Sequence, residues 1–268
     1  MISTPRSIGN YVLEHELGRG ATSQVWRGRH RFLHERAVAV KILLSQDEES
    51  VARFSREADL ASRLRHPNVV AVYDHGTAGS FLYTIMELVQ GGSLRQHMEK
   101  HGRVSLKDAV SIFRQIGAAL DFAHSQQIIH RDVSPGNILL EAGPAGRALL
   151  TDFGIARLPQ HSHTTAHVIM GTPGFFSPEH AQSATAVTAL SDVYGLGVVL
   201  YFMLTGAMPW EKQPEHPDYQ FGQIVPLSAR DVDLPPDVDS VFQTLLAVDP
   251  KKRYPTAASA VEALDRAL

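Results

Sequence analysis

The secondary-structure signal of this sequence changes sharply at Gln90-Gly91-Gly92-Ser93. Before these residues, short runs alternate between apolar and polar side chains, which is the pattern of half-buried β-strands. The expected strands cover residues 11–17, 24–27, 37–40, 69–73 and 81–89. One segment, 48–64, instead carries its apolar side chains at helical spacing. The chain is therefore expected to be α+β, with a small strand-rich lobe over residues 11–89 hinged to a larger, mainly helical lobe over residues 90–268.

The larger lobe is expected to consist mostly of helices. Residues 106–124 carry a broad apolar face, and helices return from residue 191 onward. Short apolar runs at 128–129, 138–140 and 148–150 have strand character and lie in a loop-rich middle.

The composition limits the class of protein. Of the 268 residues, 44% are hydrophobic and 20% are charged, which is typical of a globular protein and argues against a disordered or fibrous one. The chain has no cysteine, which excludes disulfides, thiolate zinc sites and a cysteine nucleophile, and which fits a reducing compartment. The net charge of −3 provides no basic footprint for nucleic acid.

Membrane insertion by this chain is not expected either. The longest apolar stretch, Val193 to Leu204, has twelve residues, whereas a helix that spans a bilayer needs about 20. Residues 1–6 are not followed by the apolar core of a secretory signal. These features predict a soluble protein whose most apolar helix is buried in its own core.

A pair of glycines marks a candidate phosphate-binding turn. Gly18 and Gly20 stand between two expected strands, because the residues after them alternate like a strand rather than opening a helix. Such a hairpin lets backbone N–H groups approach a phosphate closely. Lys41, one of only six lysines among 25 basic residues, ends the next apolar strand. Glu57, on the following helix, can serve as its counter-ion.

A second group of polar residues lies in the loop-rich middle of the chain. His130-Arg131-Asp132 is followed five residues later by Asn137, and Asp152-Phe153-Gly154 begins twenty residues after Asp132. Amide and carboxylate oxygens are the hard ligands that Mg²⁺ prefers, and a carboxylate can orient an attacking hydroxyl. Together with the glycine turn and Lys41, this group predicts phosphate-transfer chemistry.

With these motifs in this order, the chain resembles the protein kinase superfamily, specifically the bacterial-type (Hanks-type, eukaryotic-like) Ser/Thr kinases, over residues 11–267. The resemblance implies the bilobal protein kinase fold, in which one catalytic domain has a small β-rich lobe with one helix and a larger helical lobe. It implies ATP and Mg²⁺ as cofactors, with Mn²⁺ as a substitute, and transfer of the γ-phosphate to Ser or Thr hydroxyls of protein substrates. It also implies a cytoplasmic protein, or the cytoplasmic domain of a longer one.

The resemblance assigns the nucleotide-binding residues. Gly18, Gly20 and Val25 match the glycine-rich loop over ATP, in which Ser23 takes the place of the third glycine. Lys41 would contact the α- and β-phosphates and pair with Glu57. Apolar side chains would sandwich the adenine ring, and backbone atoms would hydrogen-bond to its edge. The apolar residues are Leu17, Val25, Ala39 and Leu139, and the backbone atoms belong to Glu87 and Val89.

The resemblance also assigns catalytic and supporting roles in the larger lobe. Asp132 would accept the proton of the substrate hydroxyl, and Asn137 and Asp152 would hold Mg²⁺. Glu179, in Ser177-Pro178-Glu179, should form a buried ion pair with Arg253. Asp192 should open the buried helix and fasten the backbone of the catalytic loop.

One catalytic-loop residue departs from the family pattern, because Ser134 stands where Ser/Thr kinases usually carry a lysine that contacts the γ-phosphate. An active kinase is favoured, since the other catalytic residues are retained. The alternative is a pseudokinase that binds nucleotide or serves as a scaffold. A small-molecule phosphotransferase of the aminoglycoside kinase type is disfavoured, because that type normally lacks the His-Arg-Asp form and the Ser177-Pro178-Glu179 segment.

Regulation is expected in the activation segment, residues 152–179. Arg131 precedes Asp132, and kinases with this arginine often need a phosphate on that segment. The hypothesis is autophosphorylation at Thr164 or Thr165, with Thr172 kept for substrate positioning. By family resemblance, a homodimer formed through the small lobe could carry out this autophosphorylation.

Overall fold

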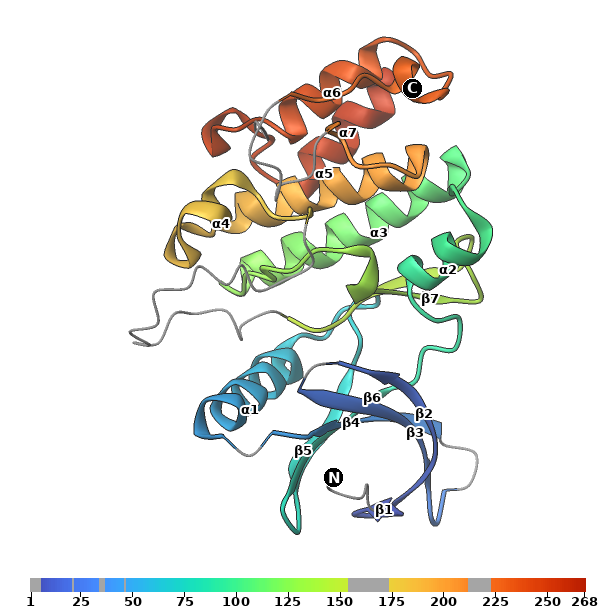
Figure 1. The fold of residues 1–268 in the computed structure, drawn as a ribbon, viewed down its shortest axis with the longest axis vertical. Helices are drawn as coiled ribbons and strands as arrows, with labels where there is room; N and C mark the ends of the chain where they lie inside the picture. The colour runs from blue at the N-terminus through green and yellow to red at the C-terminus, as the bar shows by residue number, and fades with distance from the viewer. Residues whose placement is uncertain (1–5, 21, 34–36, 46, 154–173, 212–222) are drawn as a thin grey trace. The chain divides into compact units, whose positions relative to one another are not determined.

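The structure is a computed structural model that describes residues 6–20, 22–33, 37–45, 47–153, 174–211 and 223–268. The chain divides into two compact units, Met1–Gln90 and Gly91–Leu268. Figure 1 labels their helices and strands.

The first unit is built on one antiparallel sheet of six strands in the order β1-β2-β3-β4-β6-β5 (Figure 1). The strands are β1 Ser7–Ile8, β2 Tyr11–Arg19, β3 Ser23–His30, β4 Ala37–Leu43, β5 Val72–Ala78 and β6 Phe81–Glu87. Alternate side chains of the central strands point to one face, as the pleat requires. Val38, Val40 and Ile42 of β4 pack there with Ile8 and Ile85, and all five are fully buried.

The strand expected at residues 69–73 was misplaced, because β5 begins only at Val72. Val69 and Val70 are buried although they precede the strand, so the apolar run indicates burial and not a β-strand. The Val69 N–H donates to the His66 carbonyl at 3.1 Å, and a ring nitrogen of His66 accepts the Asn68 N–H at 3.1 Å. These two bonds make a turn that delays the start of the strand.

Helix α1, Glu48–Arg63, is the one helix in the described part of the first unit. Asp47 caps its N-terminus by accepting the Ser50 N–H at 2.8 Å, and two glutamates occupy the first turn, where the helix dipole favours negative charge. Hydrogen bonds from Ser45 and Ser50 lower the pKa of Asp47 to about 2. Phe54 and Ala58 are buried along one face, which fixes the rotation of the helix.

The second unit is mainly helical. Its α-helices are α2 Leu94–His101, α3 Leu106–Ser125, α4 Pro178–Gln182, α5 Ala189–Thr205, α6 Asp237–Leu245 and α7 Ala257–Ala267. A two-stranded antiparallel sheet joins β7 Ile138–Glu141 to β8 Arg147–Leu150. The short 3-10 helices are η1 Pro135–Asn137, η3 Ala184–Ala186, η4 Leu227–Arg230 and η5 Pro250–Lys252.

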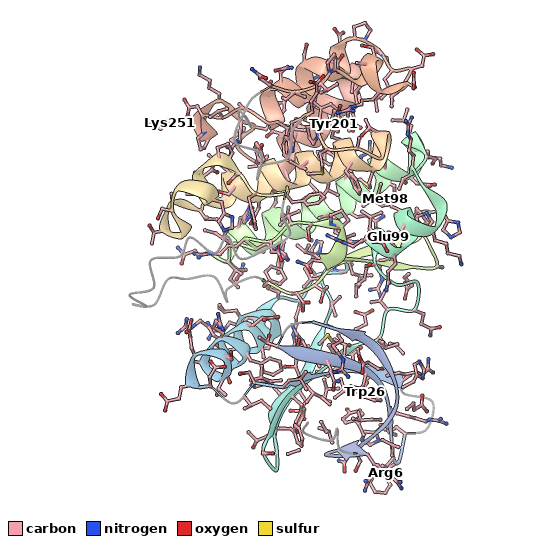
Figure 2. The ribbon with its side chains drawn as sticks, viewed as in Figure 1. Arg6, Trp26, Met98, Glu99, Tyr201 and Lys251 are labelled. Carbon is pink, nitrogen blue, oxygen red and sulfur yellow. The ribbon has the colours of Figure 1, made fainter. Side chains whose placement is uncertain are left out.

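Helix α5 forms the centre of this unit, and its residues from Ser191 to Leu200 are all buried. This confirms the buried core helix expected at Val193–Leu204. Within the described ranges, no helix combines the length and the apolar character that crossing a bilayer requires. Helix α2 is one-sided: Met98 is buried, whereas its neighbour Glu99 is exposed (Figure 2).

The strand expected at residues 128–129 is absent. Gln127 takes a left-handed conformation with φ of 60°, and the Ile128 N–H returns to the Ala123 carbonyl at 2.9 Å. These residues therefore end α3 and lead into a loop. Ile128 is buried, so its apolar character again reports packing.

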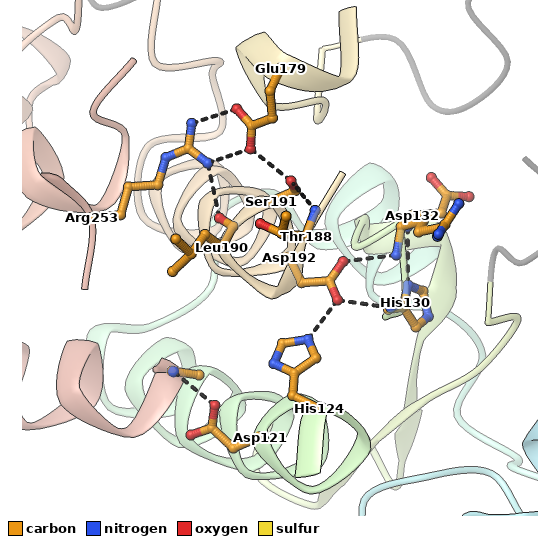
Figure 3. A network of polar contacts seen from close by, with 12 residues as sticks. Asp121, His124, His130, Asp132, Glu179, Thr188, Leu190, Ser191, Asp192 and Arg253 are labelled. Carbon is orange, nitrogen blue, oxygen red and sulfur yellow. Dashed lines mark hydrogen bonds and ion pairs between the residues drawn. The ribbon is translucent and has the colours of Figure 1, made fainter. Parts of the chain in front are cut away.

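The last helix is fastened to α3 by one carboxylate. The two oxygens of Asp121 accept the backbone N–H groups of Ala257 and Ala258 at 2.9 and 2.8 Å. Figure 3 shows one of these two bonds. These N–H groups belong to the first turn of α7, which has no partners for them inside the helix. Asp121 thus acts as a second cap, supplied from another helix.

Candidate active site

The two expected glycines lie at the tip of a hairpin, as predicted. Strands β2 and β3 pair Gly18 with Val25 and Arg19 with Gln24, and the Gly20 N–H donates to the Ser23 carbonyl at 2.8 Å. No described atom lies within 4 Å of the position that a Cβ on Gly18 would take. The backbone at this turn is therefore open to a ligand on that side.

An ion pair joins β4 to α1. The Lys41 Nζ lies 2.8 Å from the Glu57 Oε1, and the two side chains keep only 12% and 20% of their exposure. The predicted partnership is therefore confirmed. Because both groups are largely removed from water, removal of either partner would leave a charge that is buried and unpaired.

The small-lobe residues expected to contact adenine differ in exposure. Ala39 is buried, Val25 is half-buried, and Leu17 is 41% exposed. The Glu87 N–H already donates to the Ala71 carbonyl at 2.9 Å, so a ligand at Glu87 would have to use its carbonyl oxygen. Val89 follows the end of β6 and is half-buried. Their contact with adenine stays a prediction, as does that of the half-buried Leu139 in the second unit.

The catalytic-loop candidates Asp132 and Asn137 are directly bonded to each other. The Asn137 Nδ2 donates to the Asp132 carboxylate at 2.8 Å and to the Asp132 carbonyl at 2.9 Å. The Asp132 N–H in turn donates to the His130 Nδ1 at 3.2 Å. The fully buried His130 therefore accepts at Nδ1 and donates from Nε2 to the Thr151 carbonyl at 3.0 Å. The orientation of the Asp132 carboxylate is fixed by this loop.

Asp192, at the start of α5, holds the backbone of the same loop (Figure 3). Its carboxylate accepts the N–H groups of His130 and Arg131, each at 2.8 Å. This confirms the role expected for Asp192. Arg131 has a left-handed φ of 70°, which is unfavourable for a residue with a Cβ, and the bonds to Asp192 stabilise it there.

His124 is a supporting residue that the sequence did not reveal. From α3, its Nε2 lies 2.7 Å from the Asp192 carboxylate. The spacing of 68 residues between the two carries no local signal. The imidazole completes a set of three donors around a carboxylate that is almost entirely buried.

The two expected metal ligands are brought together by the β7–β8 hairpin. The Thr151 N–H donates to the Asn137 carbonyl at 3.0 Å, which places Asp152 next to Asn137. The Asn137 amide nitrogen is bonded to Asp132, so its oxygen is turned the other way. Asp152 is exposed and left-handed, with φ of 56°. One amide oxygen and one carboxylate fit Mg²⁺, which commonly takes few protein ligands and completes its shell with phosphates and water.

A buried ion pair lies at the start of α5, next to Asp192. The Arg253 guanidinium binds both oxygens of Glu179, at 2.7 and 2.8 Å, and the Ser191 hydroxyl donates to the same carboxylate at 2.7 Å. Burial acts to raise the pKa of Glu179, but the hydrogen bonds from Arg253 and Ser191 outweigh it and hold that pKa below its ordinary value. The ring of Tyr194 lies 4.7 Å from the guanidinium carbon of Arg253. The predicted pair is thus confirmed.

A small cavity lies beside Asp132 in the second unit. Its lining includes Arg131, Ser177 and His180, together with the aromatic ring of Phe176. Burial lowers the pKa of the Arg131 guanidinium, and the charge of Asp192 acts in the opposite direction. The cavity gives a polar wall next to the carboxylate that would meet a substrate hydroxyl.

Comparison with known proteins decides the family. The profile of the protein kinase domain matches residues 11–264. The chain belongs to the protein kinase domain family. Over 96% of its length this kinase domain is 41% identical to the serine/threonine-protein kinase PknB of Mycolicibacterium smegmatis and 35% identical to the serine/threonine-protein kinase PrkC of Bacillus subtilis. It spans only 43% and 40% of those two relatives.

A solved structure shows the same fold. The crystal structure of Rad53 residues 1–466 in complex with AMP-PNP superposes on this kinase domain with a TM-score of 0.74 and 27% sequence identity. The match covers 95% of this chain and 65% of the Rad53 chain. The bilobal protein kinase fold expected from the sequence is therefore confirmed.

The residue that departs from the family pattern, Ser134, is fully buried in this kinase domain. Its carbonyl accepts the Asn137 N–H at 3.0 Å, which closes the short helix η1. A buried serine cannot replace the positive charge of a lysine at the surface of the loop. The described loop thus holds the Asp132 carboxylate in place without the usual cation at position 134.

The expected regulatory threonines Thr164, Thr165 and Thr172, together with Gly154, lie outside the described residues of this kinase domain. Arg131 is described and is half-buried beside the small cavity. The roles of all four regulatory candidates stay predictions.

Proposed function

We propose that this chain is an ATP-dependent Ser/Thr protein kinase domain that transfers the γ-phosphate of Mg·ATP to Ser or Thr hydroxyls of proteins. The observation that carries the proposal is the fixed Asp132 carboxylate, held through Asn137 and through the loop that Asp192 fastens. The names of PknB and PrkC as serine/threonine-protein kinases support the reaction. The AMP-PNP in the Rad53 structure supports a nucleotide of the ATP type.

Each polar residue then has a chemical role. The Asp132 carboxylate accepts the proton of the attacking hydroxyl, and its bond to Asn137 keeps it aimed. Lys41, held by Glu57, binds the α- and β-phosphates. Asn137 and Asp152 hold Mg²⁺, which supplies charge neutralisation on the phosphates. Catalysis by such a site is mainly positioning and electrostatic stabilisation.

The absent lysine at position 134 is expected to slow this reaction rather than abolish it. One missing cation weakens the stabilisation of the transferring phosphate, whereas Lys41 and the two metal ligands remain. The competing proposal is a pseudokinase, which would bind Mg·ATP and transfer nothing. The two proposals differ in one measurable quantity, the rate of phosphate transfer.

The deciding experiment measures transfer of radiolabel from [γ-³²P]ATP with Mg²⁺ to the chain itself and to a generic basic protein. Asp132→Asn serves as the inactive control, because it keeps the shape and removes the base. Transfer by the wild type and at least about a hundredfold less by Asp132→Asn supports the kinase. Equal background from both proteins, with Mg·ATP still raising the melting temperature of the wild type, supports the pseudokinase.

A second variant tests directly whether the missing lysine at position 134 matters. Ser134→Lys restores the family lysine, and a rise in the rate of transfer would show that the missing charge limits this kinase. An unchanged rate would show that the departure is harmless.

Autophosphorylation at Thr164 or Thr165, with Thr172 positioning substrate, is part of the same proposal. Mass spectrometry after incubation with Mg·ATP tests it, and an unmodified segment in an active enzyme contradicts it. The homodimer and the cytoplasmic location likewise stay proposals.

A further inference from the structure

We propose that Arg95 forms a subsite for an acidic side chain of the protein substrate, so that this kinase domain prefers acceptor residues flanked by Asp or Glu. The inference rests on the proposed function, because it concerns the protein substrate of the same site.

Arg95 lies beside the catalytic loop. It is the second residue of α2, and its Nε lies 3.6 Å from the position that a Cβ on Gly136 would take. Gly136 stands between Asp132 and Asn137 in the sequence. Because glycine has no side chain, the guanidinium of Arg95 lies next to the backbone of the loop. Gly136 is half-buried, whereas Arg95 is exposed and can be reached by a substrate.

The backbone that carries Arg95 is fixed relative to this loop. Ser93 caps α2 by accepting the Gln96 N–H at 3.2 Å, and the Gln96 side chain accepts the Ser93 N–H at 2.9 Å. The Leu140 N–H donates to the Gly92 carbonyl at 2.9 Å. The start of α2 is therefore fastened to β7, which begins directly after Asn137.

Within the described part of the chain, the positive charge of Arg95 is not paired with a negative one. Its side chain is exposed, and among the described residues none forms a hydrogen bond or ion pair with it. The first turn of α2 contains no acidic residue, and a cation there faces the positive end of the helix dipole. Arg95 therefore gains no stabilisation from the dipole of its own helix. A residue that breaks a local rule in this way beside an active site indicates a ligand.

The ligand that matches is a carboxylate. A guanidinium binds a carboxylate with two parallel hydrogen bonds, and the helix dipole adds to the attraction. Gly136 lies four residues from Asp132, which limits their separation to about 14 Å. An extended substrate advances about 3.3 Å per residue, so the acidic side chain would lie within about four residues of the acceptor.

The test measures kcat/KM for matched peptides with one Ser acceptor, in which Glu, Ala or Lys is placed at each of the four positions on either side. At one or two positions, Glu is expected to exceed Ala by about tenfold, as for a charge-assisted hydrogen bond. Arg95→Ala should bring this ratio to about one, and Arg95→Glu should favour Lys instead. Lys100→Ala, an exposed cation on the same helix, is the matched control and should keep the wild-type ratio.

The outcomes separate the two proposals. Phosphorylation of Glu, Ala and Lys peptides at equal rates contradicts the acidic subsite and leaves the kinase proposal standing. A change in KM for ATP in Arg95→Ala, with the peptide ratio intact, also contradicts it, because Arg95 would then serve the nucleotide. A chain that phosphorylates no peptide and not itself contradicts both proposals. A melting temperature of Arg95→Ala equal to the wild type would show that the change in ratio does not come from misfolding.

Discussion

Asp192 and Arg131 are 61 positions apart in the sequence, yet the Asp192 carboxylate accepts the Arg131 N–H at 2.8 Å and holds that residue at a φ of 70°. Asp192 is the fourth residue of α5 and lies in the buried part of that helix, so the catalytic loop takes its backbone conformation from the core of its unit. This relation explains how a loop without regular structure can keep a carboxylate in one orientation.

Asp192→Asn is expected to loosen the catalytic loop. The substitution keeps the shape, but an amide NH₂ replaces one acceptor oxygen and faces a backbone N–H. The free energy of unfolding should fall by about 1–3 kcal/mol, the cost of one unsatisfied buried donor, and kcat should fall with it. Urea unfolding and steady-state kinetics measure the two effects. A variant with wild-type kcat would show that the bonds to His130 and Arg131 do not position the loop.

Glu57→Gln is expected to weaken nucleotide binding or transfer through Lys41. The amide cannot neutralise the ammonium that now lies 2.8 Å from the carboxylate, so kcat/KM for ATP should fall by about 10- to 100-fold. Glu49→Gln is the matched control, because Glu49 lies on the same helix and its side chain is 56% exposed. Its ion pair with Arg53 has an N–O distance of 3.6 Å. The prediction is wrong if the two variants lose activity equally.

Glu179 is expected to make part of the stability depend on pH. Its pKa in the folded protein lies below the ordinary value of 4.5, so between these two values the unfolded chain binds more protons than the folded one. The free energy of unfolding should therefore fall as pH falls through this window, and the contribution should be fully present above about pH 5.

Glu179→Gln isolates this contribution from that of the other carboxylates. At pH 7 it should destabilise the protein by about 3–5 kcal/mol, since it leaves the buried Arg253 without its counter-charge. Urea unfolding from pH 7 to pH 3 gives the free energy of unfolding of the wild type and of the variant. The difference between these two free energies should become smaller below about pH 4.5. A difference that stays constant over this range would contradict the assignment.

Asp121→Ala is expected to loosen α7. Two N–H groups in the first turn of that helix lose their acceptor, which should lower the free energy of unfolding by about 1–2 kcal/mol, as for the loss of a helix cap. Asp265→Ala, which removes an exposed ion pair with Arg114, is the control and should cost less than about 1 kcal/mol. Equal losses from the two variants would argue against the capping role.

Motif order predicted more of this protein than apolar patterning did. The Lys41–Glu57 and Glu179–Arg253 pairs and the Asp192 clamp could be placed from family resemblance, and the structure contains all three. Patterning placed α1, α3 and α5 well, because one apolar face or a long apolar run is a strong helical signal. It failed at residues 69–71 and 128–129, where buried apolar residues lie in turns.

The remaining site residues carry no local signal. His124 matters only through a carboxylate 68 positions away, and Arg95 only through a glycine on another element. The residues around His124 and Arg95 form no motif that would distinguish either position from others on a helix. Their roles depend on which elements the fold brings together.

The first turn of α5 joins two networks through adjacent residues. Asp192 bonds the catalytic loop, and Ser191 bonds the Glu179–Arg253 pair (Figure 3). Opening either network would displace the same helical turn. The amide protons of His130 and Arg131 should therefore exchange with solvent at the same slow rate as those of the α5 core, and Arg253→Ala should accelerate all of them together. On this expectation, the loop that would carry the chemistry opens together with the most slowly opening part of its unit.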